Sequence, residues 1–341
     1  MINQLVSVVV VTYNAEKTIE EALNSVFLQT YERIELIISD DGSKDKTVEI
    51  CKKWIQVHKS RFLRVELIEE VNAGVAVNLN RALSKCDGDW IKEMSGDDLL
   101  PIDSITNALK YVTNNKIDTI CCFKVAQFYQ DSNGVNHFTT IMPDAYTEYQ
   151  FSQSASKQYN TMLREYLVFP SSSALINKRF HSNVGWYDAE FPYVEDYPYN
   201  LKITRKGYKI YYCPNIISYC HRTNMESTNQ SNRYFMNPRT FGIDGILDQQ
   251  NEKYVKPYIH KYDLVFYLHF YLSKLRRRIV IELLGNKKDR LSVFINRFLL
   301  ALDPFMTKRK IYNLFFFSKS VSLNKQLIER IECKPWSNKY E

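Results

Sequence analysis

Short apolar runs and longer amphipathic segments alternate over residues 4–100. The valine-rich run from Val6 to Val11 is typical of a strand buried on both faces, and it ends at the polar sequence Thr12-Tyr13-Asn14. Asn14 is a favoured helix N-cap residue, and apolar residues at helical spacing follow it, namely Ile19, Leu23, Val26 and Phe27. The first unit is therefore predicted to be a strand followed by a helix.

The same unit repeats along the chain. Further strands are predicted at 34–39, 65–68 and 90–94, with helices at about 44–58 and 74–86. This alternation predicts an α/β fold with a doubly wound, mostly parallel sheet and right-handed crossovers. Ligands bind such sheets beyond the carboxyl ends of the strands, where the polar sequences TYN, DDGS and SGDD lie. Three strand ends are thus predicted to form one binding edge.

The pattern changes after residue 120. A hairpin is predicted around the turn Asp131-Ser132-Asn133-Gly134, and the polar residues 140–165 suggest an irregular connection. A helix is then predicted to end at Gly207, before a strand over 208–212 that stops at Pro214.

Composition and termini narrow the class of protein. The chain has 341 residues, of which 45% are hydrophobic and 14% aromatic, so a disordered chain is excluded. Its seven cysteines lack metal or redox spacing and are predicted to be buried, reduced thiols. The N-terminus lacks the pattern of a signal peptide, and no apolar run is long enough to span a bilayer. We therefore expect a cytoplasmic protein without a transmembrane helix.

Charge is distributed unevenly along the chain. Residues 1–250 contain 26 Lys and Arg against 30 Asp and Glu, whereas residues 251–341 contain 19 against 8. We therefore predict two regions, a first domain over 1–250 and a basic, aromatic-rich helical region over 251–341. The basic and bulky apolar residues of 255–320 suit peripheral contact with an anionic membrane. The alternative is helices packed on the first domain with a solvated basic face. Nucleic acid is not predicted as a partner, because no nucleic-acid motif accompanies the charge.

Adjacent acids at the fourth strand end are the first candidates for chemistry. Asp97 and Asp98 can share a divalent cation, which prefers hard oxygen ligands and leaves coordination places for phosphate oxygens. Alternatively, the pair caps the segment that follows. Asp40 and Asp41 either form an Asx turn or supply an acceptor for the edge N–H of a nucleobase.

Two further regions carry candidate residues. Gly74, between Asn72 and Asn78, can begin a helix whose free N–H groups favour a phosphate. Glu195 and Asp196 lie among aromatic residues that can raise the pKa of an Asp and make it a base for a hydroxyl proton; the alternative is an acidic helix N-terminus. His221 is either a metal ligand or phosphate contact, or a structural histidine.

Four motifs follow one another over residues 4–225: VVVVTYNAEKTIEEALNSVFLQTY, ELIISDDGSKDKT, NAGVAVNLNRALSKCDGDWIKEMSGDD and YVEDYPYNLKITRKGYKI. Each lies at a strand end where a parallel sheet binds its ligands. Together they resemble the motifs of the inverting family 2 glycosyltransferases of the GT-A fold, including enzymes that build bacterial surface polysaccharide such as capsule or O-antigen.

The resemblance implies that residues 1–250 form the catalytic domain, and it assigns roles to individual residues. It assigns the nucleotide-sugar pocket to Thr12, Tyr13, Asn14, Asp40, Asn72, Gly74, Asn78 and Asp97, with Asp40 on the base, most often uracil. It assigns Mn²⁺ or Mg²⁺ to Asp98 and His221, and base catalysis to Asp196 with Glu195 orienting the acceptor. The implied reaction is one inverting displacement, from a UDP-sugar to a hydroxyl of a saccharide acceptor that is lipid-linked in related enzymes.

The sequence differs from the family pattern at two places, and two other classes of protein are alternatives. Ser95 stands where many members have the first Asp of the metal motif, and Tyr219-Cys220-His221-Arg222 is one residue short of the usual Tyr-Arg-x-His order. A sugar-1-phosphate nucleotidyltransferase would need a Gly-rich, basic loop after the first strand, which TYNAEK is not. A non-catalytic nucleotide-sugar binding or scaffold protein descended from the family is the other alternative.

Overall fold

The computed structural model describes residues 3–165, 167, 169, 171–223, 234–242, 245–259 and 263–332. The first elements are β1 (Val6–Thr12), α1 (Ile19–Phe27), β2 (Ile34–Asp40), α2 (Thr47–His58), η1 (Lys59–Arg61), β3 (Arg64–Glu69), α3 (Val75–Leu83), β4 (Trp90–Ser95) and α4 (Ser104–Asn114). There follow β5 (Ile120–Gln130), β6 (Asn136–Met142), α5 (Ala145–Ser152), α6 (Ala155–Glu165), η2 (Ser171–Ser173), β7 (Ala174–Asn177), α7 (Lys178–Val184), α8 (Asp196–Arg205) and β8 (Tyr211–Arg222). The last are α9 (Pro238–Phe241), α10 (Ile246–Gln250), η3 (Asn251–Val255), η4 (Lys256–Tyr258), α11 (Leu264–Arg278), η5 (Ile279–Leu283), α12 (Arg290–Leu302) and α13 (Pro304–Glu332).

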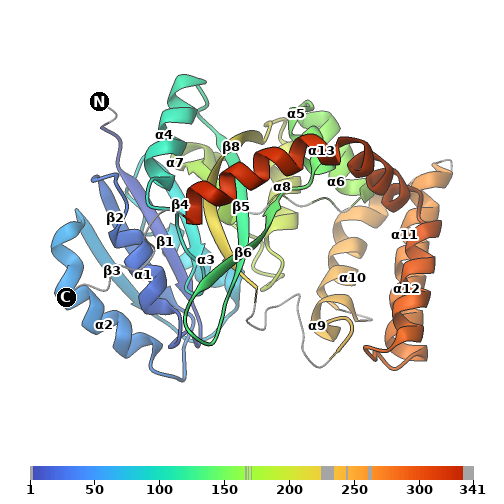
Figure 1. The fold of residues 1–341 in the computed structure, drawn as a ribbon, viewed down its shortest axis with the longest axis horizontal. Coiled ribbons are helices and arrows are strands. Elements are labelled where there is room, and N and C mark those ends of the chain that lie inside the picture. Colours follow the sequence, from blue (N-terminus) through green and yellow to red (C-terminus); the bar gives the residue numbers. More distant parts are fainter. Residues whose placement is uncertain are drawn as a thin grey trace.

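The described strands form one eight-stranded sheet (Figure 1). Its order is β3-β2-β1-β4-β7-β5-β6, and β8 pairs with β5. β1 is parallel to β2 and β4, β2 is parallel to β3, and β5 is parallel to β8, whereas β7 and β6 run antiparallel to their neighbours. The prediction of a mostly parallel α/β sheet is confirmed, and the carboxyl ends of β1, β2 and β4 meet at one edge.

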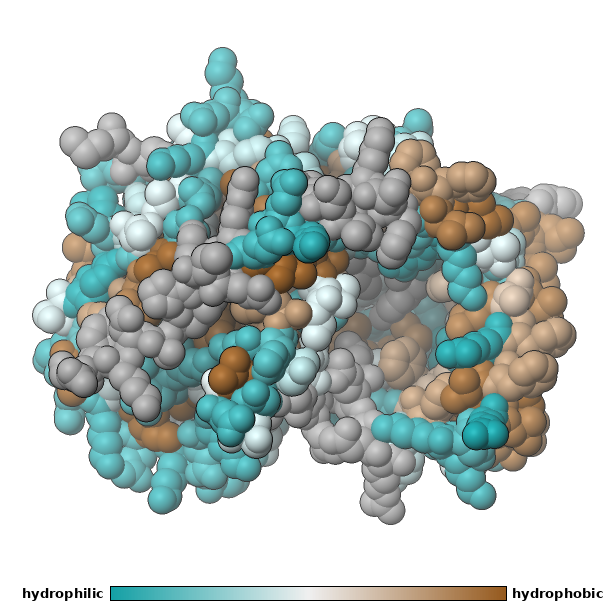
Figure 2. Space-filling model, in the orientation of Figure 1, coloured by the Kyte–Doolittle hydropathy of each residue, from teal (hydrophilic) through white to brown (hydrophobic). Residues whose placement is uncertain are grey.

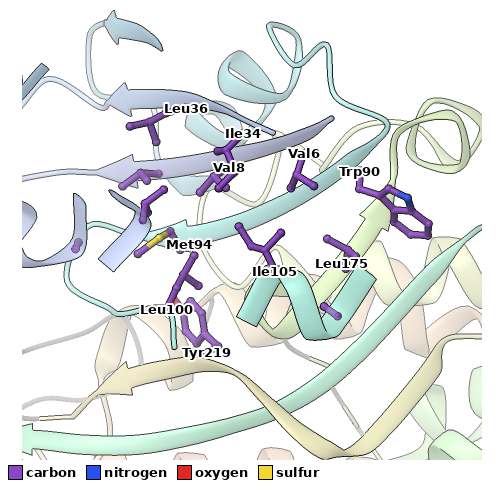
Figure 3. Close-up of a cluster of buried hydrophobic side chains, with 14 of the residues drawn as sticks. Val6, Val8, Ile34, Leu36, Trp90, Met94, Leu100, Ile105, Leu175 and Tyr219 are labelled. Carbon is purple, nitrogen blue, oxygen red and sulfur yellow. The ribbon is translucent and has the colours of Figure 1, made fainter. Parts of the chain in front are cut away.

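Helices cover both faces of this sheet. Val8 and Val10 of β1 pack in a cluster with α1, α2 and α4, whereas Val9 points to the opposite face, toward α3 and α8. Figure 3 shows part of the first cluster, with Val6 and Val8 of β1 beside Ile34 and Leu36 of β2 and with Ile105 of α4 below them. Burial of each such side chain contributes roughly 1.5–3 kcal/mol. The packing of β1 on both faces therefore fixes the position of the binding edge.

Three local predictions were wrong. Residues 140–165 contain the two helices α5 and α6, in which Asp144 caps α5 and Gln158 is fully buried in α6. Pro214 does not end the last strand, since β8 continues to Arg222 with a register irregularity opposite Phe123 and Lys124, where a missing N–H is tolerated. Asn14 is not a helix cap; its φ is 51°, and α1 begins only at Ile19.

The region after α10 is helical, as predicted. α11 and α12 lie at one end of the molecule, and α13 returns across it to contact α5, β6 and β8 (Figure 1). Arg309 Nε donates to Asp144 Oδ2 at 2.8 Å, and Leu327 packs with Phe128 and Cys220 of the sheet. α10 continues directly into η3 across the predicted division at 250/251, and that division stays a prediction.

The six cysteines among the described residues are buried and free, as predicted, and Cys333 lies outside those residues. Within the part of the chain that the structure describes, no helix combines the length and the apolar character that a bilayer crossing requires.

Candidate active site

A cavity of about 730 Å³ opens at the carboxyl ends of β1 and β4. Its lining includes most residues predicted for the site: Thr12, Tyr13, Asn14, Asn72, Gly74, Asn78, Asp97, Asp98 and His221. Residues from strand ends more than 200 positions apart thus meet, because parallel strands end at the same edge. Asp40, Glu195 and Asp196 are the predicted residues outside this lining.

The end of β1 presents an aromatic side chain on an ordered turn. Tyr13 is 50% exposed at the cavity, which suits stacking against a planar base. Asn14 fixes the turn to the β2 loop, since its N–H donates to Ser43 Oγ and its Oδ1 accepts from Lys44 N–H, both at 2.8 Å. The positive φ of Asn14 is a conformation that Asn adopts more readily than most residues.

In the DDGS turn, Asp41 and not Asp40 lies on the cavity. Asp40 is buried, and its oxygens accept from the backbone N–H and the hydroxyl of Ser43. Asp41 lines the cavity and accepts from the N–H groups of Ala73 and Gly74, both at 2.9 Å. The turn therefore places Asp41 and not Asp40 on the cavity lining, and a single sequence offers no signal that separates the two adjacent Asp residues.

Gly74 joins the N-terminus of α3 to the loop that precedes α8. Its φ is +89°, and a Cβ at this position would lie 2.4 Å from Cβ of Pro192. Ala76 N–H donates to Pro192 O at 3.3 Å, and Asn80 exchanges two hydrogen bonds with the backbone of Tyr187. The glycine is therefore required both by conformation and by the close approach of the 187–195 loop.

We expect Gly74→Ala to lower the thermal midpoint and to impair donor binding, because the added methyl group displaces Pro192. Gly134→Ala is the matched control: its φ is +79°, but nothing lies within 4 Å of its added Cβ. The control carries only the conformational penalty of about 1 kcal/mol. Thermal unfolding and nucleotide binding measured on both variants check this, and equal behaviour of the two would contradict the role given to Pro192.

Asp97 and Asp98 differ in their surroundings. Asp98 is 2% exposed; its Oδ1 accepts from Arg222 N–H at 2.7 Å, and its Oδ2 accepts from the Tyr219 hydroxyl. These bonds fix the carboxylate from β8. Asp97 lies nearer the opening, and burial together with the negative charge of Asp98 raises its pKa to about 6. Two carboxylates therefore lie next to each other where a cation would bind.

His221 reaches the same carboxylate from the end of β8. Its Nδ1 lies 3.2 Å from Oδ1 of Asp98. Burial opposes protonation, but the hydrogen bond to Asp98 and the charges of Asp98 and Asp97 outweigh it and raise the pKa of His221. No group of three or more His, Cys, Asp or Glu side chains in metal-binding arrangement occurs among the described residues. One carboxylate and one imidazole nevertheless fit Mn²⁺ or Mg²⁺ that keeps places for phosphate oxygens and water.

Glu195 and Asp196 begin α8, just after the cavity residue Tyr193. Both are partly buried, and Ser171 N–H donates to Asp196 Oδ1 at 3.0 Å. Burial raises the pKa of Asp196 above its usual value, and burial together with the charge of Asp196 raises that of Glu195 to about 8. A raised pKa makes the carboxylate a stronger base, which suits a group that must take a proton from a hydroxyl.

The backbone that precedes these acids is strained. Val194 has a φ of 59°, which is unfavourable for a β-branched residue. The fully buried Gln250 of α10 donates to Val194 O at 3.0 Å. Strain of this kind, on the order of 1–3 kcal/mol, persists only where the surroundings hold it. The helical region thus stabilises the loop that carries Glu195 and Asp196.

Residues 234–239 form a cavity wall that the sequence did not predict. Tyr234, Asn237, Pro238 and Arg239 line the cavity, and the Arg239 guanidinium lies 5.2 Å from the ring centroid of Tyr193. They lie beyond the last matched motif and in no periodic pattern, so only the folded chain brings them to the strand ends.

Comparisons with known proteins agree with this geometry. The sequence profile described as Glycosyl transferase family 2 matches residues 7–185. The chain is 29% identical over 150 residues to glycosyltransferase GlyA of Streptococcus pneumoniae (43% of this chain, 20% of the relative). It is 28% identical over 208 residues to UDP-Glc:alpha-D-GlcNAc-diphosphoundecaprenol beta-1,3-glucosyltransferase WfaP of Escherichia coli (60% and 72%). The matches therefore span between a fifth and about three quarters of these relatives.

Solved structures share the fold at low sequence identity. TarS 1-349 of S. aureus in complex with UDP-GlcNAc is 16% identical with a TM-score of 0.55, covering 88% of this chain and 82% of that one. Mannosyltransferase PcManGT of Pyrobaculum calidifontis in complex with GDP-Man and Mn²⁺ is 17% identical with a TM-score of 0.56, covering 94% and 87%. At this identity the similarity concerns the fold alone.

Proposed function

The chain belongs to glycosyl transferase family 2, and on that premise we propose that it transfers a sugar from a nucleotide-sugar donor to a hydroxyl group of a saccharide acceptor. One observation carries the proposal: the cavity gathers Tyr13, Asp41, Asp97 and Asp98 at a single sheet edge, and Asp196 follows the cavity residue Tyr193 by three positions in the chain. In the proposed function these residues would receive the base, the diphosphate and the acceptor hydroxyl.

The proposed reaction is one inverting displacement. Asp196 takes the proton of the acceptor hydroxyl, the acceptor oxygen forms a bond to the anomeric carbon, and the bond to the nucleoside diphosphate breaks with its electron pair. Glu195 helps to orient the acceptor. A divalent cation held by Asp98 and His221 would offset the charge of the departing diphosphate. Asp97 faces the ribose and the sugar.

We propose a UDP-sugar as the donor. Asp41 can accept the edge N–H of uracil while Tyr13 stacks on its face, and both side chains lie on the cavity. The name of WfaP describes transfer from UDP-Glc, which supports this choice. PcManGT, which has the same fold, is in complex with GDP-Man, so GDP-sugars are the principal competing donors.

A direct experiment is a thermal-shift screen of UDP-glucose, UDP-GlcNAc, UDP-galactose and GDP-mannose, each with Mn²⁺ and with EDTA. We expect at least one UDP-sugar to raise the unfolding midpoint by several degrees, because a ligand that binds the folded state stabilises it, and to do so less with EDTA. A screen in which no nucleotide sugar stabilises the protein would contradict the proposal. The non-catalytic alternative predicts stabilisation without release of UDP.

The acceptor is proposed to be lipid-linked, with the C-terminal helices on an anionic membrane. Large apolar side chains of these helices are exposed: Leu264, Leu268 and Leu275 on α11, Leu291, Phe294 and Phe298 on α12, and Ile311, Leu314 and Phe315 on α13. Figure 2 shows hydrophobic residues gathered over the end of the molecule where α11 and α12 lie. Basic residues accompany them, which matches anionic lipid. WfaP, by its name, acts on a diphosphoundecaprenol-linked sugar.

Vesicle flotation tests this contact. We expect the triple variant Leu268→Gln, Phe294→Gln, Phe298→Gln to bind vesicles of phosphatidylcholine with phosphatidylglycerol about tenfold more weakly than wild type, because apolar insertion is lost. The control variant Val57→Gln, Leu63→Gln, Val71→Gln changes exposed apolar residues of the catalytic domain. Equal flotation of the two variants would contradict the membrane contact.

A further inference from the structure

Arg239 is a cation on the cavity wall that has no role in the proposed reaction. The described residues that line the cavity include three carboxylates, and Arg239 is the only Lys or Arg among them. Its side chain is exposed, and its Cζ lies 5.2 Å from the ring centroid of Tyr193. Within the described ranges, no acid forms an ion pair with the guanidinium. Its N–H donors are therefore available to a ligand in the cavity.

The backbone at Arg239 is fixed from two sides. Asn237 caps α9, and its Oδ1 accepts from Arg239 N–H at 3.0 Å. Asn286, which follows η5, holds the preceding residue: Met236 N–H donates to Asn286 Oδ1, and Asn286 Nδ2 donates to Met236 O, both at 2.8 Å. Asn286 is 6% exposed, and its φ of 56° is a conformation that Asn tolerates. The C-terminal helical region therefore sets the position of this wall.

Tyr193 gives the guanidinium a second support. It follows Pro192, whose O accepts from Ala76 N–H at 3.3 Å at the start of α3, so the ring is tied to the sheet edge that carries the cavity. A guanidinium that lies over an aromatic ring keeps N–H donors for an anion. Arg239 is thus held from both the catalytic domain and the C-terminal region, unlike a solvated surface arginine.

The charge of the cavity favours a diphosphate as the anion. The diphosphate of a UDP-sugar is negative, and it gains further negative charge when its bond to the sugar breaks. The three carboxylates of the lining repel such a group, so positive charge on the wall favours its binding. Arginine is suited to this task, because its paired N–H groups form charge-assisted hydrogen bonds to two phosphate oxygens.

We propose that Arg239 binds the diphosphate of the donor and stabilises it as it leaves, and that Asn286 is a positioning residue that holds Arg239 at the cavity. The inference rests on the proposed function, in which the donor is a UDP-sugar. It gives the C-terminal region a part in donor binding, in addition to the proposed membrane contact.

Calorimetric titration with UDP, with Mn²⁺ present, tests the role of Arg239. Arg239→Gln is expected to bind UDP about tenfold more weakly than wild type, because charge-assisted hydrogen bonds are lost. Uridine, measured as a competitor, should bind both proteins equally, since it has no phosphate. Arg239→Lys keeps the charge without the paired donors and should lie between the two. The control is Arg205→Gln: Arg205 is also exposed and lies 5.8 Å from the Tyr258 ring centroid, outside the cavity lining, so UDP binding should not change.

Asn286→Gly tests the positioning role. Glycine adopts the positive φ without strain, so this variant removes only the two side-chain hydrogen bonds to Met236. We expect UDP binding to weaken several-fold, with uridine binding unchanged. Adding Asn286→Gly to Arg239→Gln should cause little further loss, because Asn286 acts through Arg239. Independent losses that multiply in the double variant would indicate a merely structural role and would contradict the positioning.

The outcomes separate this inference from the proposed function. UDP binding by Arg239→Gln that equals that of wild type would overturn the inference, even if the KM for the acceptor rises, and so would an equal loss of UDP and uridine binding. UDP release from a UDP-sugar by wild type would leave the proposed function standing in each of these cases. A wild-type protein that binds no nucleotide would refute the proposed function, and this inference with it.

Discussion

Replacing Asp196 with asparagine is expected to lower kcat by about 10³-fold, because general-base catalysis by a placed side chain contributes 10²–10⁴-fold. Asparagine keeps the size of the side chain and can still accept from Ser171 N–H, so the start of α8 should be preserved. The KM for the donor should change little, since Asp196 lies outside the cavity lining. Steady-state kinetics with a UDP-sugar and Mn²⁺ measure both quantities.

The matched control is Glu190→Gln. Glu190 precedes α8 in the same loop, is exposed, and pairs with Lys253 at 2.6 Å. Its replacement removes one negative charge near the site without touching the cavity, and kcat should stay within about twofold of wild type, because exposed ion pairs contribute little. Equal loss of activity in both variants would indicate a general effect of loop charge and would contradict the role of Asp196.

Replacing Asp98 with asparagine is expected to weaken activation by Mn²⁺ about 10²-fold, because its carboxylate is the oxygen ligand that we propose for the cation. Asparagine can still accept from Arg222 N–H through its Oδ1, so the contact between the turn after β4 and the end of β8 is kept. The measurement is UDP release as a function of Mn²⁺ concentration. Excess Mn²⁺ should restore part of the rate.

Asp118→Asn serves as the control for this variant. Asp118 is an exposed acid just before β5, at the sheet edge opposite to the carboxyl ends of β1 and β4, so its loss should leave the Mn²⁺ response unchanged. An unaltered Mn²⁺ response in Asp98→Asn would exclude Asp98 as the metal-binding residue. If Asp98→Asn keeps its Mn²⁺ response and still binds UDP, Asp97 becomes the candidate metal ligand.

The sequence was informative where local pattern and topology agree. The valines of β1 alternate between two buried faces, and such a strand in a βα series can only be central, so the binding edge and its polar clusters could be predicted. The positions of Asp97, Asp98 and Gly74 on the cavity follow from that topology alone. The predicted helix end at Gly207 is also confirmed, because α8 ends at Arg205 and Gly207 has a φ of +86°.

Tertiary contacts determine the features of the fold and the site that the sequence did not predict. The helices α5 and α6 are polar in sequence and stable because Gln158 is buried against the chain at Ile210. Whether Asp40 or Asp41 faces the cavity depends on one backbone turn. The wall formed by residues 234–239 and the hydrogen bond from Gln250 to Val194 arise from segments far away in sequence, and no periodicity marks them.

The central claim is that this cavity binds a nucleotide sugar with a divalent metal and that Asp196 activates the acceptor. Its most direct test is UDP release from a panel of UDP-sugars by wild type and Asp196→Asn, each with Mn²⁺ and with EDTA, and with UDP binding measured in parallel. We predict release by wild type with Mn²⁺ only, and in Asp196→Asn a nearly complete loss of release with UDP binding retained. Release by Asp196→Asn at the wild-type rate, or release that is unaffected by EDTA, would contradict the account.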